Sequence, residues 1–425
     1  MNVSVECITP GFELAYSQVY AINSGSLRLK REIAKDPWQI NLDNYRRILS
    51  LRLQESGKEN VLRAIRILER RDDVVSATPN FYEVFQHAIG DHDTFSSMRA
   101  HGIPSNQWGL SQIDAARAWG ITRGSNEVIV GVMDTGIDAN HNDLRSRLMN
   151  NLASDLTSEN HRLTDPDGHG THVAGTIAAQ GGLSYGLAPN IRLVSLRVLY
   201  GNGRAAPVRY QINAIAHAIR YNIRILNFSG GGTSNDPDRL QAIKHFPGIF
   251  IASAGNDNRN NDTHSQPHFP SSHRLPNLIS VGASDSNDNR ARWGGILGIN
   301  RSGSNYGLRT VCVFAPGVGI RGSLPDNRAG NLTGTSMAAP FVAGIAAMIQ
   351  SVRPDLRENT KRAIIMQTVD QSSSFQNISV SGGRVNAYHA VRFAMGLSYG
   401  ATWIFGKYIT PGTYNMSIQD TQINL

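Results

Sequence analysis

Cysteine is almost absent from this chain of 425 residues, in which only Cys7 and Cys312 occur. Two cysteines cannot form the several bridges of a disulfide framework, so the fold must be held together by an apolar core. Cys312 lies in the apolar run 311–315, where we expect a buried and reduced thiol. Cysteine content therefore leaves the cellular compartment undecided.

Long apolar runs and targeting signals are missing as well. No uninterrupted apolar run reaches the roughly 18 residues of a membrane-spanning helix, so no such helix is predicted. The first residues, MNVSVECITPGFELAY, lack the basic stretch and apolar core of a signal peptide. Either an export signal has been removed or the protein is not exported by that route.

Charge of one sign is not concentrated anywhere in the sequence. The formal net charge is +8, but no block of consecutive basic residues with interleaved aromatics occurs. We therefore expect an ordinary basic surface and no nucleic-acid partner. A hydrophobic content of 40% with 17% charged residues excludes global disorder, and the length suggests two or three domains.

Residues 1–85 predict a small α+β domain. It contains one segment of helical spacing between short strand-like runs, with strands at 48–53, 74–77 and 81–85 and a helix at 58–71. On composition alone it could be any small binding or regulatory domain. Residues 86–106 show no periodicity and predict an exposed linker.

From residue 107 to residue 395, apolar runs alternate with helical segments. Such runs are typical of parallel strands covered on both faces, and the alternation favours a mainly parallel α/β sheet with helices on both faces. The predicted strands are 128–133, 191–199, 223–228, 249–254 and 278–281, and the predicted helices are 173–179, 208–221 and 338–349. Residues 396–425 form a short C-terminal extension whose pattern assigns no role.

Three polar segments stand at the junctions of these elements. DTGID places Asp134 at the carboxyl end of a strand, where α/β proteins gather ligands. HGTHVAGT leads from a polar loop into a helix at His169, and GTSMAAP places Ser336 at the start of a long apolar helix. Each segment alone has an ordinary interpretation: a turn aspartate, a structural histidine and an N-capping serine.

Together, in the order Asp134, His169, Ser336, the three segments resemble almost letter for letter the active-site motifs of the subtilase family. The resemblance runs from about residue 107 to residue 391 and implies a subtilisin-like serine endopeptidase. His169 would act as base and then acid for the nucleophile Ser336, and Asp134 would fix the imidazole tautomer. The reaction would pass through an acyl-enzyme intermediate.

Two further segments resemble the same family. SAGN is similar to its oxyanion segment and implies Asn256 as a side-chain donor. NFSGGG resembles the edge strand that pairs with the substrate backbone, which implies Ser229, Gly230 and Gly231 as substrate-binding residues. His268, in HFP, falls where the family forms the wall of its primary specificity pocket, and we hypothesise that it narrows or polarises that pocket.

The N-terminal domain has a resemblance of its own. VLRAIRILERRDDVVSATPNFYEV is similar to the end of the propeptide domains that precede some subtilases, assist their folding and block the cleft. It implies a self-processing zymogen, cleaved between Phe85 and Gln107, in which the propeptide-like domain is an intramolecular partner. The family resemblance also implies a secreted or cell-surface location. An unrelated small α+β domain is the alternative.

No metal or other cofactor is predicted. In the family, an aspartate like Asp143 can bind calcium together with a nearby loop, but here the loop QGGLSYG looks short and contains no carboxylate. Calcium is kept only as an alternative. Asp138 and Asp143 are expected to order the turn after Asp134, and His172 is expected to be structural.

Rival interpretations fit the sequence less well. An esterase would need G-x-S-x-G and the order Ser, Asp, His, whereas here Ala338 holds the fifth position and the serine comes last. A zinc peptidase would need H-E-x-x-H, which HGTH does not provide. A degenerate protease kept as a binding protein is disfavoured, because Asp134, His169, Ser336 and Asn256 are all chemically competent.

Overall fold

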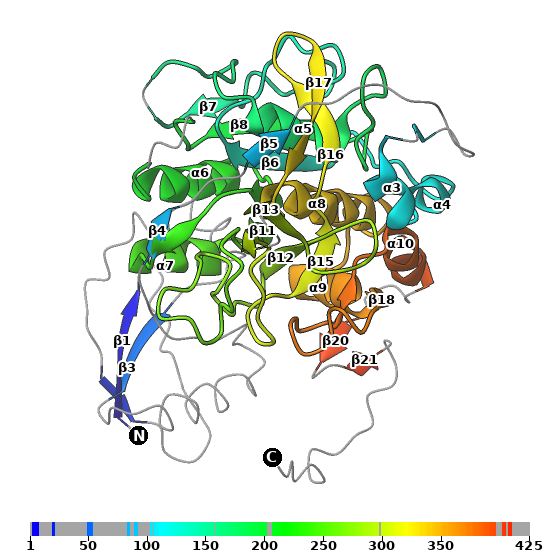
Figure 1. Cartoon of the computed structure of the whole chain (residues 1–425). Helices are drawn as coiled ribbons and strands as arrows, with labels where there is room; N and C mark the ends of the chain where they lie inside the picture. The colour runs from blue at the N-terminus through cyan, green and yellow to red at the C-terminus, as the bar shows by residue number, and fades with distance from the viewer. Residues whose placement is uncertain are drawn as a thin grey trace.

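The computed structural model describes residues 103–104, 106–157, 159–201, 206–296 and 299–396, together with the backbone of seven short strands nearer the two ends of the chain. Figure 1 shows these elements arranged around one central sheet.

A nine-stranded sheet forms the centre of the molecule, in the order β18-β19-β15-β12-β11-β9-β6-β8-β7. Its strands pair in parallel, except that β18 and β19 pair antiparallel at one edge. The prediction of a mainly parallel α/β sheet is confirmed. The bounds are β6 Ile129–Asp134, β7 Ser154–Asp155, β8 Arg192–Arg197, β9 Ile225–Phe228, β11 Ile249–Ser253, β12 Leu278–Ser284, β15 Val313–Pro316, β18 Asp370–Gln371 and β19 Gly383–Arg384.

Helices cover both faces of this sheet, which explains why its central strands are almost wholly apolar. One face packs against α6 (Arg209–Arg220) and α7 (Pro237–His245). The other packs against α5 (His169–Ala178) and α8 (Thr335–Val352), with α3 Trp108–Gln112, α4 Ala115–Trp119, α9 Glu358–Gln367 and α10 Ala387–Gly396 around them. Among the described residues, α8 alone is long and apolar enough to cross a membrane, and most of it is buried inside this fold.

Three elements extend beyond their predicted apolar runs into the polar motifs. Strand β6 includes Asp134, α5 begins at His169, and α8 begins at Thr335, so that Ser336 lies in its first turn. Pro340 lies inside α8, in its second turn, and has no N–H to donate to the carbonyl oxygen of Ser336, which accepts the Ser229 hydroxyl instead. The apolar periodicity underestimated these elements because their ends carry polar side chains.

Short strands outside the sheet border the carboxyl ends of its central strands. Strands β16 (Ile320–Leu324) and β17 (Arg328–Thr333) form an antiparallel hairpin that projects above α5 and α8 (Figure 1). Strand β10 (Gly232–Ser234) follows β9, and β13 (Arg292–Ile296) pairs with β14 (Ile299–Gly303). Cys312 is buried and reduced, as predicted.

Some of the N-terminal predictions can be compared with the structure. Strand β3 (Leu49–Leu53) lies in a predicted strand and pairs with β1 (Asn2–Cys7), which also pairs with β2 (Val19–Ala21). Strand β4 (Glu83–Phe85) pairs antiparallel with β10, and β5 (Ile89–Asp91) pairs antiparallel with β17. The predicted helix 58–71 and the predicted strand 74–77 lie outside the described residues.

The two segments that were expected to lie outside the domains also contain strands. Strand β5 belongs to the predicted linker, residues 86–106. In the C-terminal extension, β20 (Thr402–Ile404) and β21 (Lys407–Ile409) form an antiparallel pair.

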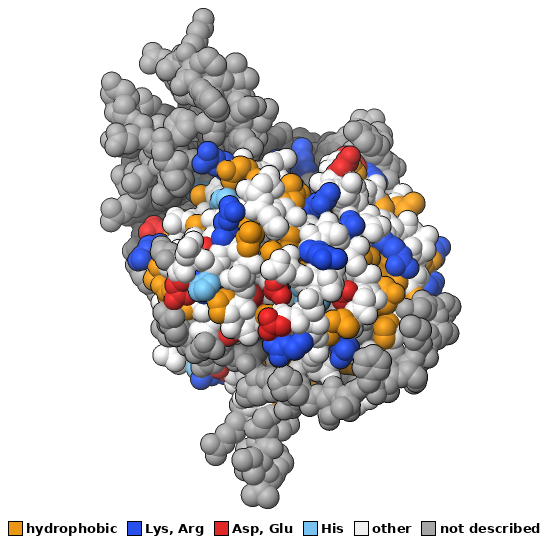
Figure 2. All heavy atoms as spheres, turned by 90° about the horizontal axis from the view of Figure 1, so that it is seen from above, with side chains coloured by type: hydrophobic (Ala, Val, Ile, Leu, Met, Phe, Trp, Pro, Cys, Tyr) orange, Lys and Arg blue, Asp and Glu red, His pale blue; other side chains and the backbone are white. Residues whose placement is uncertain are grey.

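Charged side chains are dispersed over the face of the molecule seen in Figure 2. The Lys and Arg side chains there are separated by acidic, apolar and polar groups rather than joined into one basic patch. This face has the mixed surface of an ordinary globular protein.

Candidate active site

Asp134 and His169 meet where β6 ends and α5 begins. Oδ1 of Asp134 lies 2.7 Å from Nδ1 of His169 and also accepts the N–H of Thr135 at 2.8 Å. Asp134 is fully buried, whereas the His169 side chain keeps 14% of its surface exposed. Burial disfavours the charged imidazole, but the charge and hydrogen bond of Asp134 outweigh it and raise the pKa of His169 to about 9.

A second carboxylate, that of Asp165, holds the segments that carry this pair. It accepts the hydroxyl of Thr135 at 2.8 Å and both the hydroxyl and the N–H of Thr171, at 2.7 and 2.8 Å. The Thr135 hydroxyl oxygen in turn accepts the N–H of Gly170 at 2.9 Å. Asp165 thereby ties the end of β6 to the start of α5, a role that the sequence analysis missed because it treated this residue as part of a polar loop.

Ser336 is hydrogen-bonded to Ser229 at the same edge of the sheet. Its hydroxyl donates to the carbonyl oxygen of Ser229 at 3.0 Å, and the Ser229 hydroxyl donates to the carbonyl oxygen of Ser336 at 2.8 Å. Strands β6 and β9 are neighbours with Met133 opposite Phe228, so Asp134 and Ser229 are the next residues along two adjacent strands.

In this structure the Ser336 hydroxyl thus donates to the carbonyl oxygen of Ser229 and not to the ring of His169. A serine hydroxyl moves between staggered positions by rotation about its Cα–Cβ bond. Catalytic hydrogen bonds are often loose in an enzyme without substrate and tighten when the substrate binds.

Asn256 lies beside Ser336, and two hydrogen bonds orient its side-chain amide. Its Oδ1 accepts both the N–H and the hydroxyl of Thr335, each at 2.9 Å. The Thr335 hydroxyl oxygen also accepts the N–H of Gly255 at 3.2 Å. Because the amide oxygen is engaged by donors, the amide nitrogen is left to donate elsewhere. Sequence analysis did not identify Thr335 as the residue that orients this side chain.

Gly230 and Gly231 follow Ser229 directly in the chain, and His268 lies against Gly231. Gly230 and Gly231 continue the chain from Ser229 towards β10. His268 is buried, and its ring lies so close to Gly231 that a Cβ there would come within 2.3 Å of it.

His172 and Asp138 stand in the same motifs as His169 and Asp134, but their side chains form other hydrogen bonds. His172 Nε2 lies 2.8 Å from the carbonyl oxygen of Ile320, which ties α5 to the β16–β17 hairpin. Burial lowers the pKa of His172 to about 4, so its ring is neutral. The Asp138 carboxylate accepts the N–H groups of Asn140 and Asp326 at 2.9 and 3.0 Å.

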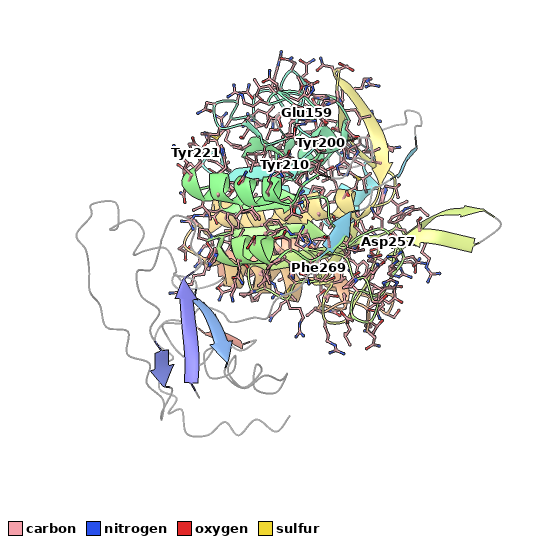
Figure 3. The ribbon with its side chains drawn as sticks, turned by 90° about the vertical axis from the view of Figure 1, so that its left-hand side faces the viewer. Glu159, Tyr200, Tyr210, Tyr221, Asp257 and Phe269 are labelled. Atoms are coloured by element: carbon pink, nitrogen blue, oxygen red, sulfur yellow. The ribbon has the colours of Figure 1, made fainter. Side chains whose placement is uncertain are left out.

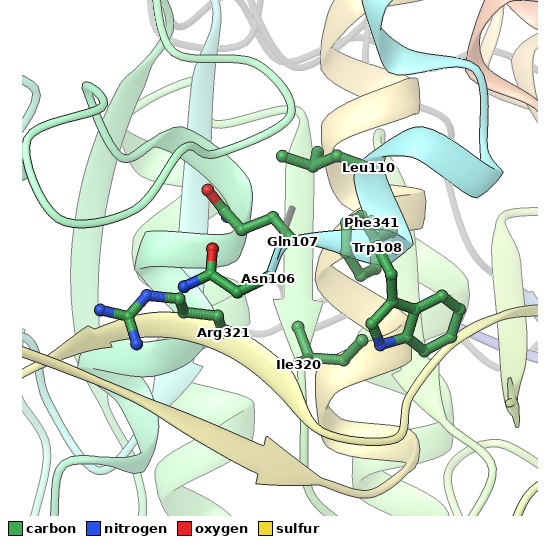
Figure 4. Close-up of a pocket in the computed structure, with 8 residues that line it drawn as sticks. Asn106, Gln107, Trp108, Leu110, Ile320, Arg321 and Phe341 are labelled. Carbon is green, nitrogen blue, oxygen red and sulfur yellow. The ribbon is translucent and has the colours of Figure 1, made fainter. Parts of the chain in front are cut away.

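Asp143 holds the loop 180–186 by hydrogen bonds. Its carboxylate accepts three successive backbone N–H groups, those of residues 182–184, at 2.8, 2.8 and 3.1 Å. Gln107, which lies near Arg321 in Figure 4, exchanges two hydrogen bonds with the backbone of Tyr185 in the same loop. N–H groups that point at a carboxylate occupy the positions that a cation bound to it would need. In the part of the chain that the structure describes, no cluster of three or more His, Cys, Asp or Glu is suited to a metal ion.

Comparisons with known proteins agree with this geometry. Residues 125–394 match the model of the Subtilase family. A thermophilic serine proteinase from Bacillus sp. (strain AK1) is 32% identical over 79% of this chain and 77% of its own length. The major intracellular serine protease of Bacillus subtilis (strain 168) is 32% identical over 57% of this chain and 74% of its own. Among solved structures, a protease from Pseudoalteromonas arctica PAMC 21717 is 26% identical with a TM-score of 0.58, and the match covers 70% of this chain and all of that one.

Proposed function

Since this chain belongs to the subtilase family and is a subtilisin-like serine endopeptidase, we propose that Asp134, His169 and Ser336 are its catalytic triad. The observation that carries the proposal is the 2.7 Å hydrogen bond between Asp134 and Nδ1 of His169. It assigns the ring proton to Nδ1 and leaves Nε2 as the acceptor that a general base needs.

In the proposed reaction, the Ser336 oxygen attacks the carbonyl carbon of the peptide bond while His169 Nε2 takes the hydroxyl proton. His169 then gives that proton to the amine that leaves, and the acyl group remains as an ester on Ser336. Water hydrolyses the ester in a second step in which His169 is again the base. Asn256 Nδ2 and the N–H of Ser336 donate to the oxyanion that forms in each step.

Peptides are the substrates of an endopeptidase, and we propose that they bind as a strand along Ser229, Gly230 and Gly231. The support for this is that β10, directly after these residues, already accepts β4 of the same chain as an antiparallel partner. Main-chain hydrogen bonds of this kind select extended segments and tolerate many side chains.

Labelling with a fluorophosphonate probe tests the triad. We expect the probe to react with the processed protein and not with the Ser336→Ala variant. Ser351→Ala, in the last turn of the same helix, is the matched control and should label normally. Labelling that persists in Ser336→Ala would show that another residue is the nucleophile.

The N-terminal domain is proposed to be a propeptide that the enzyme removes from itself. Strand β4 pairs with β10 on one side of the nucleophile, and β5 pairs with β17 in the segment that leads into Ser336 on the other. Cleavage between β4 and β5 would separate these two paired strands, which narrows the predicted cleavage window from 85–107 to Phe85–Ile89. Purified protein should become cleaved in this window, and Ser336→Ala should keep Met1 as its N-terminus. An active enzyme that retains Met1 would contradict the proposal.

We also propose that the loop held by Asp143 needs no calcium, because its amides satisfy the carboxylate directly. The secreted or cell-surface location rests on family resemblance alone, and one relative is by name an intracellular protease. Recovery of the processed protein from the culture medium would support that location, and retention within cells would contradict it.

A further inference from the structure

Two backbone segments leave the sheet next to Ser336, and the space between them is here called the gap. One segment follows β9 and contains Ser229, the acceptor of that hydroxyl, and Gly231; the other follows β11 and contains Gly255. Because β9 and β11 are adjacent parallel strands, the two segments leave the sheet side by side. Gly231 and Gly255 have φ angles of 150° and 102°, which favour glycine, so neither of them places a side chain in the gap.

The ring of His268 lies against both of these segments. A Cβ at Gly231 would lie 2.3 Å from its Cε1 and 2.8 Å from its Nε2, and a Cβ at Gly255 would lie 2.7 Å from its Cγ and 2.8 Å from its Cδ2. The ring is therefore in contact with the backbone of both segments, and only 3% of the residue is exposed.

Neighbouring residues hold the ring in place. The N–H of Phe269 donates to the carbonyl of Gly232 at 2.7 Å and the N–H of Gly232 donates back at 3.0 Å. Nδ1 of His268 lies 3.1 Å from the Ser271 hydroxyl. Figure 3 shows Phe269 on the same side of the molecule as Asp257, the residue after Asn256. Burial, followed by the charge of Arg239, lowers the pKa of His268 to about 3, so the ring stays neutral.

We propose that His268 determines the specificity of cleavage by occupying the space that would receive a large side chain. The relevant substrate residue is the one whose carbonyl carbon Ser336 attacks, here called the acyl-side residue. In this proposal its side chain enters the gap between Gly231 and Gly255, where the ring of His268 leaves room for Gly, Ala or Ser but not for a large side chain. This inference rests on the proposed function, because it concerns the same nucleophile.

The chain's own sequence agrees with this specificity. Phe85 pairs with Gly232, which is three residues beyond Ser229. A substrate strand that continues this antiparallel register would bring the residue three positions after Phe85 to Ser229, and that residue is Ala88. Between Phe85 and Ile89 the sequence reads Gln-His-Ala, so Ala88 is also its only small residue. Self-cleavage is therefore assigned to the bond between Ala88 and Ile89.

The test is a series of peptide nitroanilides that share their other residues and carry Gly, Ala, Ser, Leu or Phe as the acyl-side residue. We expect kcat/KM of the processed enzyme to be at least about tenfold higher for Ala than for Phe. His268→Gly should raise the Phe value and remove this ratio. His264→Gly, in the same loop but away from both glycines, is the control and should keep it. A wild-type preference for Phe, or an unchanged ratio in His268→Gly, would overturn the proposal.

Fluorophosphonate labelling separates this inference from the proposed function. If Ser336 does not label, the triad assignment fails. If it labels but the enzyme cleaves best after Phe or Leu, only the role of His268 fails. Should His268→Gly not fold, the wild-type ratio alone still decides. N-terminal sequencing of self-processed protein should start at Ile89, and a new N-terminus that follows a large residue would count against the inference.

Discussion

The hydrogen bond between Asp134 and His169 Nδ1 determines which ring nitrogen is available for proton transfer. The same bond also stabilises the protonated ring, because Asp134 carries a negative charge in a buried position. The pKa of His169 therefore lies above the ordinary 6.5, at about 9. The form of the ring with one proton, whose Nε2 can act as a base, is therefore expected to become the main form only as the pH rises through this range.

We therefore expect kcat/KM to rise with pH. The midpoint of this rise should lie above 6.5, towards the pKa of about 9 of His169. Asp134→Asn removes the charge that holds the proton, so the midpoint should fall, and kcat should fall by ~10⁴-fold, the loss seen for this change in trypsin-type triads. By linkage, the raised pKa contributes stability that is full below pH 6.5 and is lost as the pH rises through about 9. pH–rate profiles measure the midpoint, and a thermal melt at several pH values measures the stability.

Asp326→Asn serves as the control, because this aspartate is highly exposed. It should change neither the midpoint nor kcat. A wild-type midpoint at or below 6.5, or one that stays in place in Asp134→Asn, would show that Asp134 does not hold the His169 proton.

At this scale, the sequence identifies the proposed catalytic residues better than the residues that support them. Asp134, His169 and Asn256 stand in motifs whose letters identify them, and the structure places them at one edge of the sheet. Asp165 and Thr335 could not be found in this way. Their importance lies in hydrogen bonds that depend on the path of a loop and the start of a helix, and neither has a periodic pattern in the sequence.

Among the elements, those buried on both sides were the most predictable. Strands β6, β8, β9, β11 and β12 were all expected, because helices on both faces of the sheet require continuous apolar runs. Strands β16 and β17 were not predicted, since their sequences IRGSL and RAGNLT are short and mixed. Strand β5 was not predicted either, because its pairing with β17 involves residues more than two hundred positions away, which local sequence does not reveal.

The loop 180–186 gives a prediction at the scale of the element. Asp143→Ala would leave three amides without their acceptor, at a cost of about 1–3 kcal/mol for a buried unsatisfied group. We expect a lower Tm for this variant, measured by calorimetry. EDTA should leave the Tm of the unmodified protein unchanged, because the carboxylate is already satisfied.

A calcium ion in this loop would give the opposite pattern. Ligand at about 100 times its Kd stabilises a folded protein by about 2.7 kcal/mol, so added calcium would raise the Tm and EDTA would lower it. Asp285→Asn, in a surface turn away from this loop, provides the matched carboxylate control, and its response to EDTA should equal that of the unmodified protein. A Tm that depends on calcium would contradict the direct bond between carboxylate and loop.

Across the whole molecule, the N-terminal and catalytic parts of the chain are joined at two places. Strand β4 extends β10, and β5 extends the β16–β17 hairpin. Both contacts lie beside the segments that carry Ser229 and Ser336, so we expect the uncleaved chain to keep a substrate out of the proposed site. Separation of the two strands by cleavage is the step that would open it.

This arrangement predicts that Ala88 and His268, which lie far apart in the sequence, depend on one another. Ala88→Phe would present a large acyl-side residue to the gap beside His268, so self-processing should slow by at least about tenfold, as followed by gel electrophoresis of the full chain. Ala88→Ser should process normally, because its side chain remains small. In the double variant Ala88→Phe/His268→Gly, removal of the ring restores space, and the processing rate should recover. The double variant could instead process as slowly as Ala88→Phe while it still labels with a fluorophosphonate. In that case the residue at position 88 does not enter the gap beside His268, and the cleaved bond must lie elsewhere.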